Sequence, residues 1–240
     1  MRPFFLLSRA EKITIFIFGL LVILGIYLLF SQCGGEESER DFTDIISEDL
    51  DSDREIWPLS QGSAWRYQAE GQGTGDEVEI RVSEVEEYGE EKNYQLHFDY
   101  QSHETFEYYS YDKEGLYWHG MELPTGEYQR VPEQYLVKFP VGQSHEWEWQ
   151  GELMAVEGEE LNYRGRAKLE QGEPVKVDLP LGKKEGIEVK NEMEVELAGE
   201  ILQVEETRVY VPEIGLVKQE VVENGELQIK KLLTDYRIDD

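Results

Sequence analysis

The chain has 240 residues, of which 40% are hydrophobic and 31% are charged, and its formal net charge is −29. This apolar content can fill the core of one packed domain, which excludes collagen-like, disulfide-scaffold and wholly disordered proteins. The charge also argues against a nucleic-acid partner, because it repels phosphates and no cluster of Lys and Arg reverses the field locally.

The first 33 residues have the pattern of an export signal. Arg2, Arg9 and Lys12 precede the uncharged apolar run 13–30. Basic residues before such a run keep that end in the cytoplasm while the rest of the chain is exported. The run is long for a signal peptide and just long enough to span a bilayer, so residues 1–33 form either a cleaved signal or a permanent anchor.

The sequence around Cys33, LLFSQCGGEESE, resembles the lipobox of bacterial lipoproteins. In these proteins the cysteine is lipidated and becomes the mature N-terminus. The resemblance implies that Cys33 is a lipidation site and that the exported chain is attached to a membrane of the cell envelope. The alternative is an uncleaved single-span anchor, in which Cys33 is a small apolar residue at the end of a transmembrane helix. We favour the lipoprotein.

Residues 34–55 are typical of an acidic flexible linker, because they are rich in charge and poor in aromatic side chains. Asp49, Asp51 and Asp53 have the opening spacing of a calcium loop, but the glycine and the glutamate that such a loop needs are missing. We therefore predict no metal site in the linker. The exported domain is expected to span 56–240.

After Trp57 the hydrophobic pattern changes to a period of two, which is typical of β-strands. In the run 77–86 the step from Val82 to Val85 skips a register, which predicts a β-bulge. The dipeptide Asn224-Gly225 between two such runs predicts a tight hairpin. The other alternating runs are 93–100, 105–111, 116–123, 187–197, 200–211, 216–222 and 226–233.

No segment of this domain keeps a helical period over three turns. We therefore predict an all-β fold, either an antiparallel curved sheet or an open barrel, preceded by an N-terminal signal or anchor helix and the acidic tether.

A partial duplication indicates two similar β-modules. The segment 57–70 aligns without gaps on 139–152, and Trp65 matches Trp147. A second pair of segments, 112–118 and 212–218, shares a Gly-Leu dipeptide. Two modules with one common core are expected, since about four strands alone hardly bury enough surface.

The same segments carry a family resemblance. The aromatic segment WPLSQGSAWRY and the late stretch YVPEIGLVKQE resemble TapB-like and related bacterial lipoproteins and periplasmic β-rich domains of unknown function. The resemblance covers most of 57–237 and implies an exported β-rich domain. It brings no catalytic residues with it.

The short motifs of common enzyme chemistry are missing from the sequence. There is no phosphate-binding loop, no nucleophile elbow and no zinc-protease motif. His103 and His145 both occur in QSHE, but their spacing does not support a metal site. We predict no catalytic residue, no cofactor and no metal. A hydrolase with a carboxylate pair stays open, because such a pair is defined by its separation in space.

Rings crowd both faces of one predicted hairpin, whereas a half-exposed strand carries them on one face. One interpretation is that one face fills the core and the phenol oxygens reach its rim. The other is a concave aromatic face that takes an apolar or sugar ligand. The candidate ligand-binding residues are Tyr108, Tyr111, Tyr117, Trp118, Trp65 and Trp147.

Together these patterns predict a non-enzymatic, membrane-anchored envelope lipoprotein whose β-domain binds an apolar ligand or an envelope partner. A carbohydrate-binding protein and a purely structural envelope protein are the alternatives. A carbohydrate-binding surface would show exposed flat rows of Trp or Tyr, and a hydrolase would show convergent polar side chains in a cleft.

Overall fold

The computed structural model describes residues 56–71, 77–88, 91–100, 103–158, 163–197 and 199–239. The predictions made for the N-terminal signal, for Cys33 and for the acidic linker lie outside these residues. Within them, no helix has the length and apolar character needed to cross a membrane.

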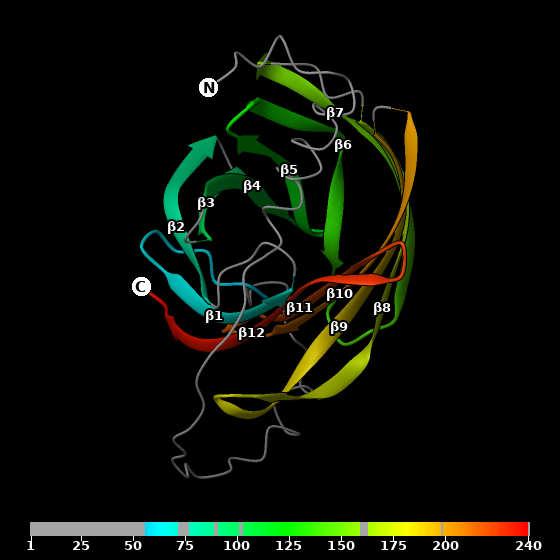
Figure 1. The fold of residues 1–240 in the computed structure, drawn as a ribbon. Coiled ribbons are helices and arrows are strands. Elements are labelled where there is room, and N and C mark those ends of the chain that lie inside the picture. Colours follow the sequence, from blue (N-terminus) through cyan, green and yellow to red (C-terminus); the bar gives the residue numbers. More distant parts are fainter. Residues whose placement is uncertain are drawn as a thin grey trace.

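The described residues form twelve antiparallel strands that close into a barrel. Each strand pairs with its neighbours in sequence, and β1 pairs with both β2 and β12. Figure 1 shows this ring, with the red strand β12 beside the cyan strand β1. The strands are β1 (Ala64–Gly71), β2 (Glu77–Tyr88), β3 (Glu91–Asp99), β4 (Glu104–Asp112), β5 (Gly115–Leu123), β6 (Gly126–Lys138), β7 (His145–Gly158), β8 (Tyr163–Leu179), β9 (Gly182–Leu197), β10 (Glu200–Val211), β11 (Gly215–Glu223) and β12 (Glu226–Arg237).

The predicted all-β antiparallel fold is confirmed, and the barrel is closed rather than open. The predicted bulge in β2 is present, because the pairing with β3 shifts between Val82 and Glu84. The predicted hairpin between β11 and β12 is present too, with Asn224 at φ 50° and Gly225 at φ 82°. Alternation thus fixes which side chains point inward along most strands.

The segment that precedes β1 closes one end of the barrel. Trp57 is buried, and its ring packs edge-on against Trp65 and Tyr109 at 5.6 Å each. Its backbone N–H donates to the Tyr111 hydroxyl at 2.9 Å, and that hydroxyl donates back to the Trp57 carbonyl at 2.8 Å. A Cβ at Gly215 would lie 2.1 Å from the Trp57 ring, so only glycine fits there. This end is therefore packed solidly.

The two segments of the predicted duplication lead into β1 and β7, which lie on opposite sides of the ring. The shared Gly-Leu dipeptides begin β5 and β11, which are also opposite one another. The two segments differ in one backbone detail, since Phe139-Pro140 is a cis peptide and Trp57-Pro58 is not. The origin of the barrel from two modules stays a prediction.

Candidate ligand-binding cavity

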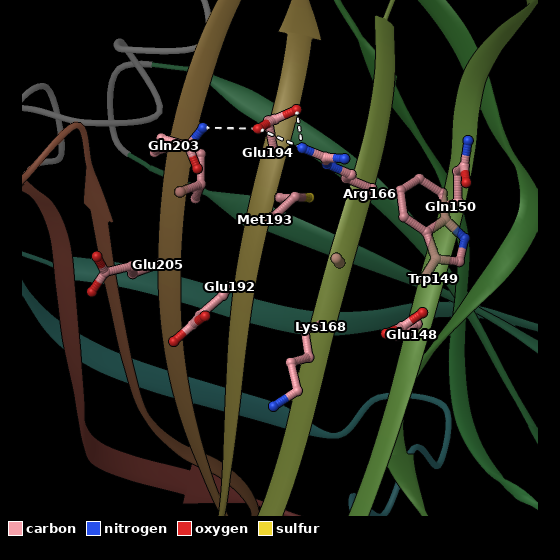
Figure 2. A pocket seen from close by; sticks show the side chains of 12 residues that line it. Glu148, Trp149, Gln150, Arg166, Lys168, Glu192, Met193, Glu194, Gln203 and Glu205 are labelled. Carbon is pink, nitrogen blue, oxygen red and sulfur yellow. Dashed lines mark hydrogen bonds and ion pairs between the residues drawn. The ribbon is translucent and has the colours of Figure 1, made fainter.

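The outer face of β7, β8, β9 and β10 forms an open, polar pocket (Figure 2). Arg166 forms an ion pair with Glu194 at 3.0 Å, and Gln203 donates to the same carboxylate at 3.2 Å. Such exposed cross-strand pairs contribute about 0–1 kcal/mol each and are screened by salt. We interpret this face as solvated surface rather than as a ligand site.

A second cavity lies inside the barrel and has a volume of about 250 Å³. It extends from Trp57 at the packed end to Leu123, Leu202 and Glu223, which are half-buried near the ends of their strands. We call this second region the mouth end. Apolar side chains line it, among them Met121, Leu123, Leu153, Val195, Leu202 and Val221. Charged and amide side chains line the rest, among them Arg130, Gln134, Asn191, Glu206, Arg208 and Lys231.

One ion pair in the cavity is fully supported by its neighbours. Arg208 Nε lies 2.6 Å from Glu206 Oε1, and the Gln219 side chain donates to the same oxygen. Burial raises the pKa of Glu206, but the charge of Arg208 and these hydrogen bonds outweigh burial and hold the pKa below its usual value. Glu206 and Arg208 therefore neutralise each other within the wall of the cavity.

Lys231 places an amine among aromatic rings. The residue is 3% exposed, and its Nζ lies 5.9 Å from the Tyr67 ring centroid, 5.5 Å from that of Phe98 and 5.9 Å from that of Tyr100. Burial lowers the pKa of this amine to about 8, while the charge of Glu107 acts in the opposite direction. Glu107 accepts a hydrogen bond from the Tyr109 hydroxyl.

Arg130 is buried between two indole rings. Its guanidinium carbon lies 4.1 Å from the Trp118 ring centroid and 4.4 Å from that of Trp149. One terminal nitrogen donates to Gln134 Oε1, and the other donates to the Tyr163 hydroxyl at 3.2 Å. No described carboxylate forms an ion pair with Arg130. Burial lowers its pKa from the usual value.

The surroundings of Arg130 compensate its charge only in part. A desolvated cation–π contact contributes about 2 kcal/mol, whereas burying an unpaired ion costs several kcal/mol. In addition, four buried N–H donors beside the cavity have no hydrogen-bond partner: Trp57 Nε1 at the packed end, and Arg130 Nε, Gln134 Nε2 and Trp118 Nε1. Two buried acceptors elsewhere in the lining, Asn191 Oδ1 and Gln228 Oε1, also have none. We call Arg130, Gln134 and Trp118 the donor cluster. Unpaired buried donors are rare in native proteins and point to a missing partner.

The structure separates the six predicted ligand-binding residues into three groups. Trp118 lines the cavity. Three others belong to the interior packing. Trp65 and Tyr111 contact Trp57, and the indole N–H of Trp147 donates to the Tyr135 carbonyl. Tyr108 and Tyr117 belong neither to the core cluster nor to the cavity lining, and on the outer face of β4 and β5 they contact Gln95 and His119 respectively.

The outer aromatic side chains do not form a flat platform. Tyr117 and Tyr135 are 5.5 Å apart with their planes tilted by 57°. The charged half of the cavity is not among the residues predicted from the sequence. The sequence carries one signal for this half of the cavity. Arg130 and Lys231 occupy positions where the alternation of their strands directs side chains inward, and Arg130 lies two residues after the buried Tyr128.

Ser110, His119 and Glu133 lie together on the outer face of the barrel. His119 Nε2 is 2.7 Å from Ser110 Oγ, and His119 Nδ1 is 3.9 Å from Glu133 Oε1. However, Ser110 is 0% exposed, and its hydroxyl donates its single proton to Asn93 Oδ1. His119 therefore cannot accept that proton in this geometry, and Ser110 does not have the arrangement of an activated nucleophile.

The described residues contain no group of three His, Cys, Asp or Glu side chains that could hold a metal ion. His103 stacks on Tyr100 at 4.8 Å, and His145 lies 3.0 Å from the Pro140 carbonyl oxygen. These two histidines are thus engaged with other parts of the barrel.

No family model matches the chain, and no curated protein sequence does. Among solved structures, a protein of Parabacteroides distasonis inferred to be a lipoprotein has a TM-score of 0.52 and 14% identity, over 77% of this chain and 99% of that one. An inferred exported protein with a YmcC-like fold from Bacteroides fragilis has a TM-score of 0.42 and 15% identity, over 75% and 98%. The first likeness shows a shared fold. Membership of the TapB-like family stays a prediction.

Proposed function

We propose that the protein is an exported, envelope-anchored binding protein whose barrel cavity holds a small molecule with an apolar body. The observation that carries this proposal is the cavity of about 250 Å³, with apolar walls toward its mouth end and unpaired polar atoms deeper inside. Small-molecule sites are concave and mainly apolar, with a few placed polar groups.

The size of the cavity favours an occupant over an empty space. Protein interiors contain few voids larger than a water molecule, and a space of about 250 Å³ far exceeds that size. Water can fill polar cavities, but it needs several polar partners for each molecule. Toward the mouth end, apolar side chains such as Leu202 and Val195 offer none, and Glu223 is the one carboxylate there among the described lining residues. An apolar ligand therefore suits that half better than water does.

The location follows from the sequence and is supported by the fold. The basic residues, the apolar run 13–30 and Cys33 are typical of a lipoprotein signal. The fold likeness to a protein inferred to be a lipoprotein agrees with this. We propose that the N-terminus attaches the barrel to a membrane of the cell envelope, where apolar ligands are abundant.

Two neighbouring residues on β10 provide a matched test. Leu202 lines the cavity, whereas Ile201 points outward and is 63% exposed. Leu202→Trp places an indole in the mouth end, and Ile201→Trp adds the same ring outside the barrel. The full-length protein and both variants are extracted gently from membranes and examined by native mass spectrometry for a bound small molecule.

We expect an added mass on the original chain and on Ile201→Trp, and its loss from Leu202→Trp. A bare protein mass for all three chains, repeated after incubation with total lipid extract, would contradict the proposal. An added mass that both variants retain would place the ligand outside the cavity and would contradict it equally.

A further inference from the structure

We propose that the ligand carries an anionic head that only accepts hydrogen bonds, a carboxylate, and that the donor cluster of Arg130, Gln134 and Trp118 binds this head. This inference rests on the proposed function, because it names the chemical class of the cavity's ligand.

The donor cluster offers hydrogen atoms and no free acceptor. Arg130 Nε, Gln134 Nε2 and Trp118 Nε1 are buried without partners. The orientation of the Gln134 amide is fixed, because its oxygen already accepts from Arg130, which leaves its nitrogen as the free end. A ligand hydroxyl could satisfy part of this set, but a carboxylate has enough lone pairs for all three donors.

The three side chains are held together by strand pairing and stacking. Trp118 on β5 is directly opposite Gln134 on β6. Arg130 lies on the same strand as Gln134, and its guanidinium is stacked on the Trp118 ring. Trp149 covers the other face of the guanidinium and donates through its own N–H to the Pro132 carbonyl at 2.8 Å. The donors are therefore placed before any ligand binds, which favours recognition.

Charge points to the same class of ligand. Arg208 has Glu206 as its partner, and Lys231 lies in the field of Glu107. Arg130 contacts aromatic rings, an amide and a hydroxyl, and it forms no ion pair with a carboxylate of the described residues, although the charge of Glu206 acts on it from a distance. A buried guanidinium that forms no ion pair is a natural partner of a carboxylate. The apolar walls at the mouth end then receive the tail of the ligand.

The test compares two probes that differ only in their heads. Octanoate and octan-1-ol have equal tails, and one ends in a carboxylate while the other ends in a hydroxyl. Their binding to the full-length chain in zwitterionic lipid nanodiscs is measured by isothermal titration calorimetry, with empty nanodiscs as the blank. Trp118→Phe removes the indole N–H but keeps a ring over Arg130. Trp147→Phe is the matched control, because its N–H donates to the Tyr135 carbonyl at 3.2 Å and does not line the cavity.

We expect octanoate to bind at least about tenfold more tightly than octan-1-ol, because hydrogen bonds to a charged group are stronger than those to a neutral hydroxyl. Trp118→Phe should weaken octanoate binding by roughly tenfold and octan-1-ol binding by less, and Trp147→Phe should change neither. Equal affinity for the two probes, or a preference for octan-1-ol, would overturn the anionic head while leaving the cavity's function intact. Binding of neither probe would overturn the proposed function as well.

Discussion

Gly151 and Gly165 face each other across β7 and β8, and the ring of Trp149 lies against both. A Cβ on Gly151 would be 2.5 Å from Trp149 Cζ2, and one on Gly165 would be 3.0 Å from Trp149 Cζ3. The two glycines thus make room for the indole that covers Arg130. The backbone of one sheet segment therefore determines where the charge in the cavity can sit.

Gly151→Ala should destabilise the barrel by about 1–3 kcal/mol, because the new methyl group also meets the Val131 carbonyl oxygen at 2.4 Å. Gly172→Ala is the control, since a Cβ there has no heavy atom within 4 Å. The free energy of unfolding in urea measures both changes. Equal stability of the two variants would show that Trp149 does not depend on this gap.

The amine of Lys231 should make stability depend on pH. Burial lowers its pKa to about 8 in the folded chain, against an ordinary value of 10.5. Between these two values the unfolded chain binds more protons than the folded one, so stability rises with pH. Below about pH 8 both states are protonated, and the buried charge disfavours folding by a constant amount.

Lys231→Met should therefore be more stable than the original chain at about pH 7, and the gap should shrink by about 2 kcal/mol at about pH 9.5. Urea unfolding at the two pH values measures it. Buried tyrosines such as Tyr67 titrate at higher pH and set the upper limit of the window. Parallel pH profiles for the two chains would contradict the lowered pKa.

Ser110 should behave as a structural residue. Ser110→Ala leaves Asn93 and His119 without their common partner, which should lower stability by about 1–3 kcal/mol. A fluorophosphonate probe, which labels activated serines, should leave the full-length protein unmodified. Covalent labelling that disappears in Ser110→Ala would instead favour a hydrolase.

Cys33 should carry lipid. Cells fed an alkyne fatty acid should label the original chain and not Cys33→Ser, and the intact mass of the original chain should lack the residues before Cys33. An unlabelled original chain that retains residues 1–32 would favour the single-span anchor. Asp235→Asn, far along the sequence, serves as a control for expression.

The strand pattern could be predicted where one face of a strand is apolar and the other charged. This condition holds in β2, where the bulge at Val82 was also visible, and at the Asn224-Gly225 hairpin. It fails in β5, where the pairing with both neighbours shifts around Trp118 and Gly120. Each bulge changes which side chains point inward, so the face occupied by Trp118 could not be read from alternation.

The charged half of the cavity could not be predicted for a different reason. Arg130 lies in YQRVPEQY, which has the composition of an exposed loop, and only the partners of Arg130 keep it inside. Those partners come from β5, β7 and β8, and no local pattern connects them. The aromatic candidates were chosen by residue type, and one of the six lines the cavity.

The most direct test of the proposed carboxylate site is an experimental structure of the full-length protein with octanoate. We expect the carboxylate to lie within hydrogen-bonding distance of Arg130 Nε and Trp118 Nε1, and the tail to be directed toward Leu202 and Leu123. A cavity that holds only water at saturating octanoate, or octanoate bound elsewhere on the barrel, would contradict it.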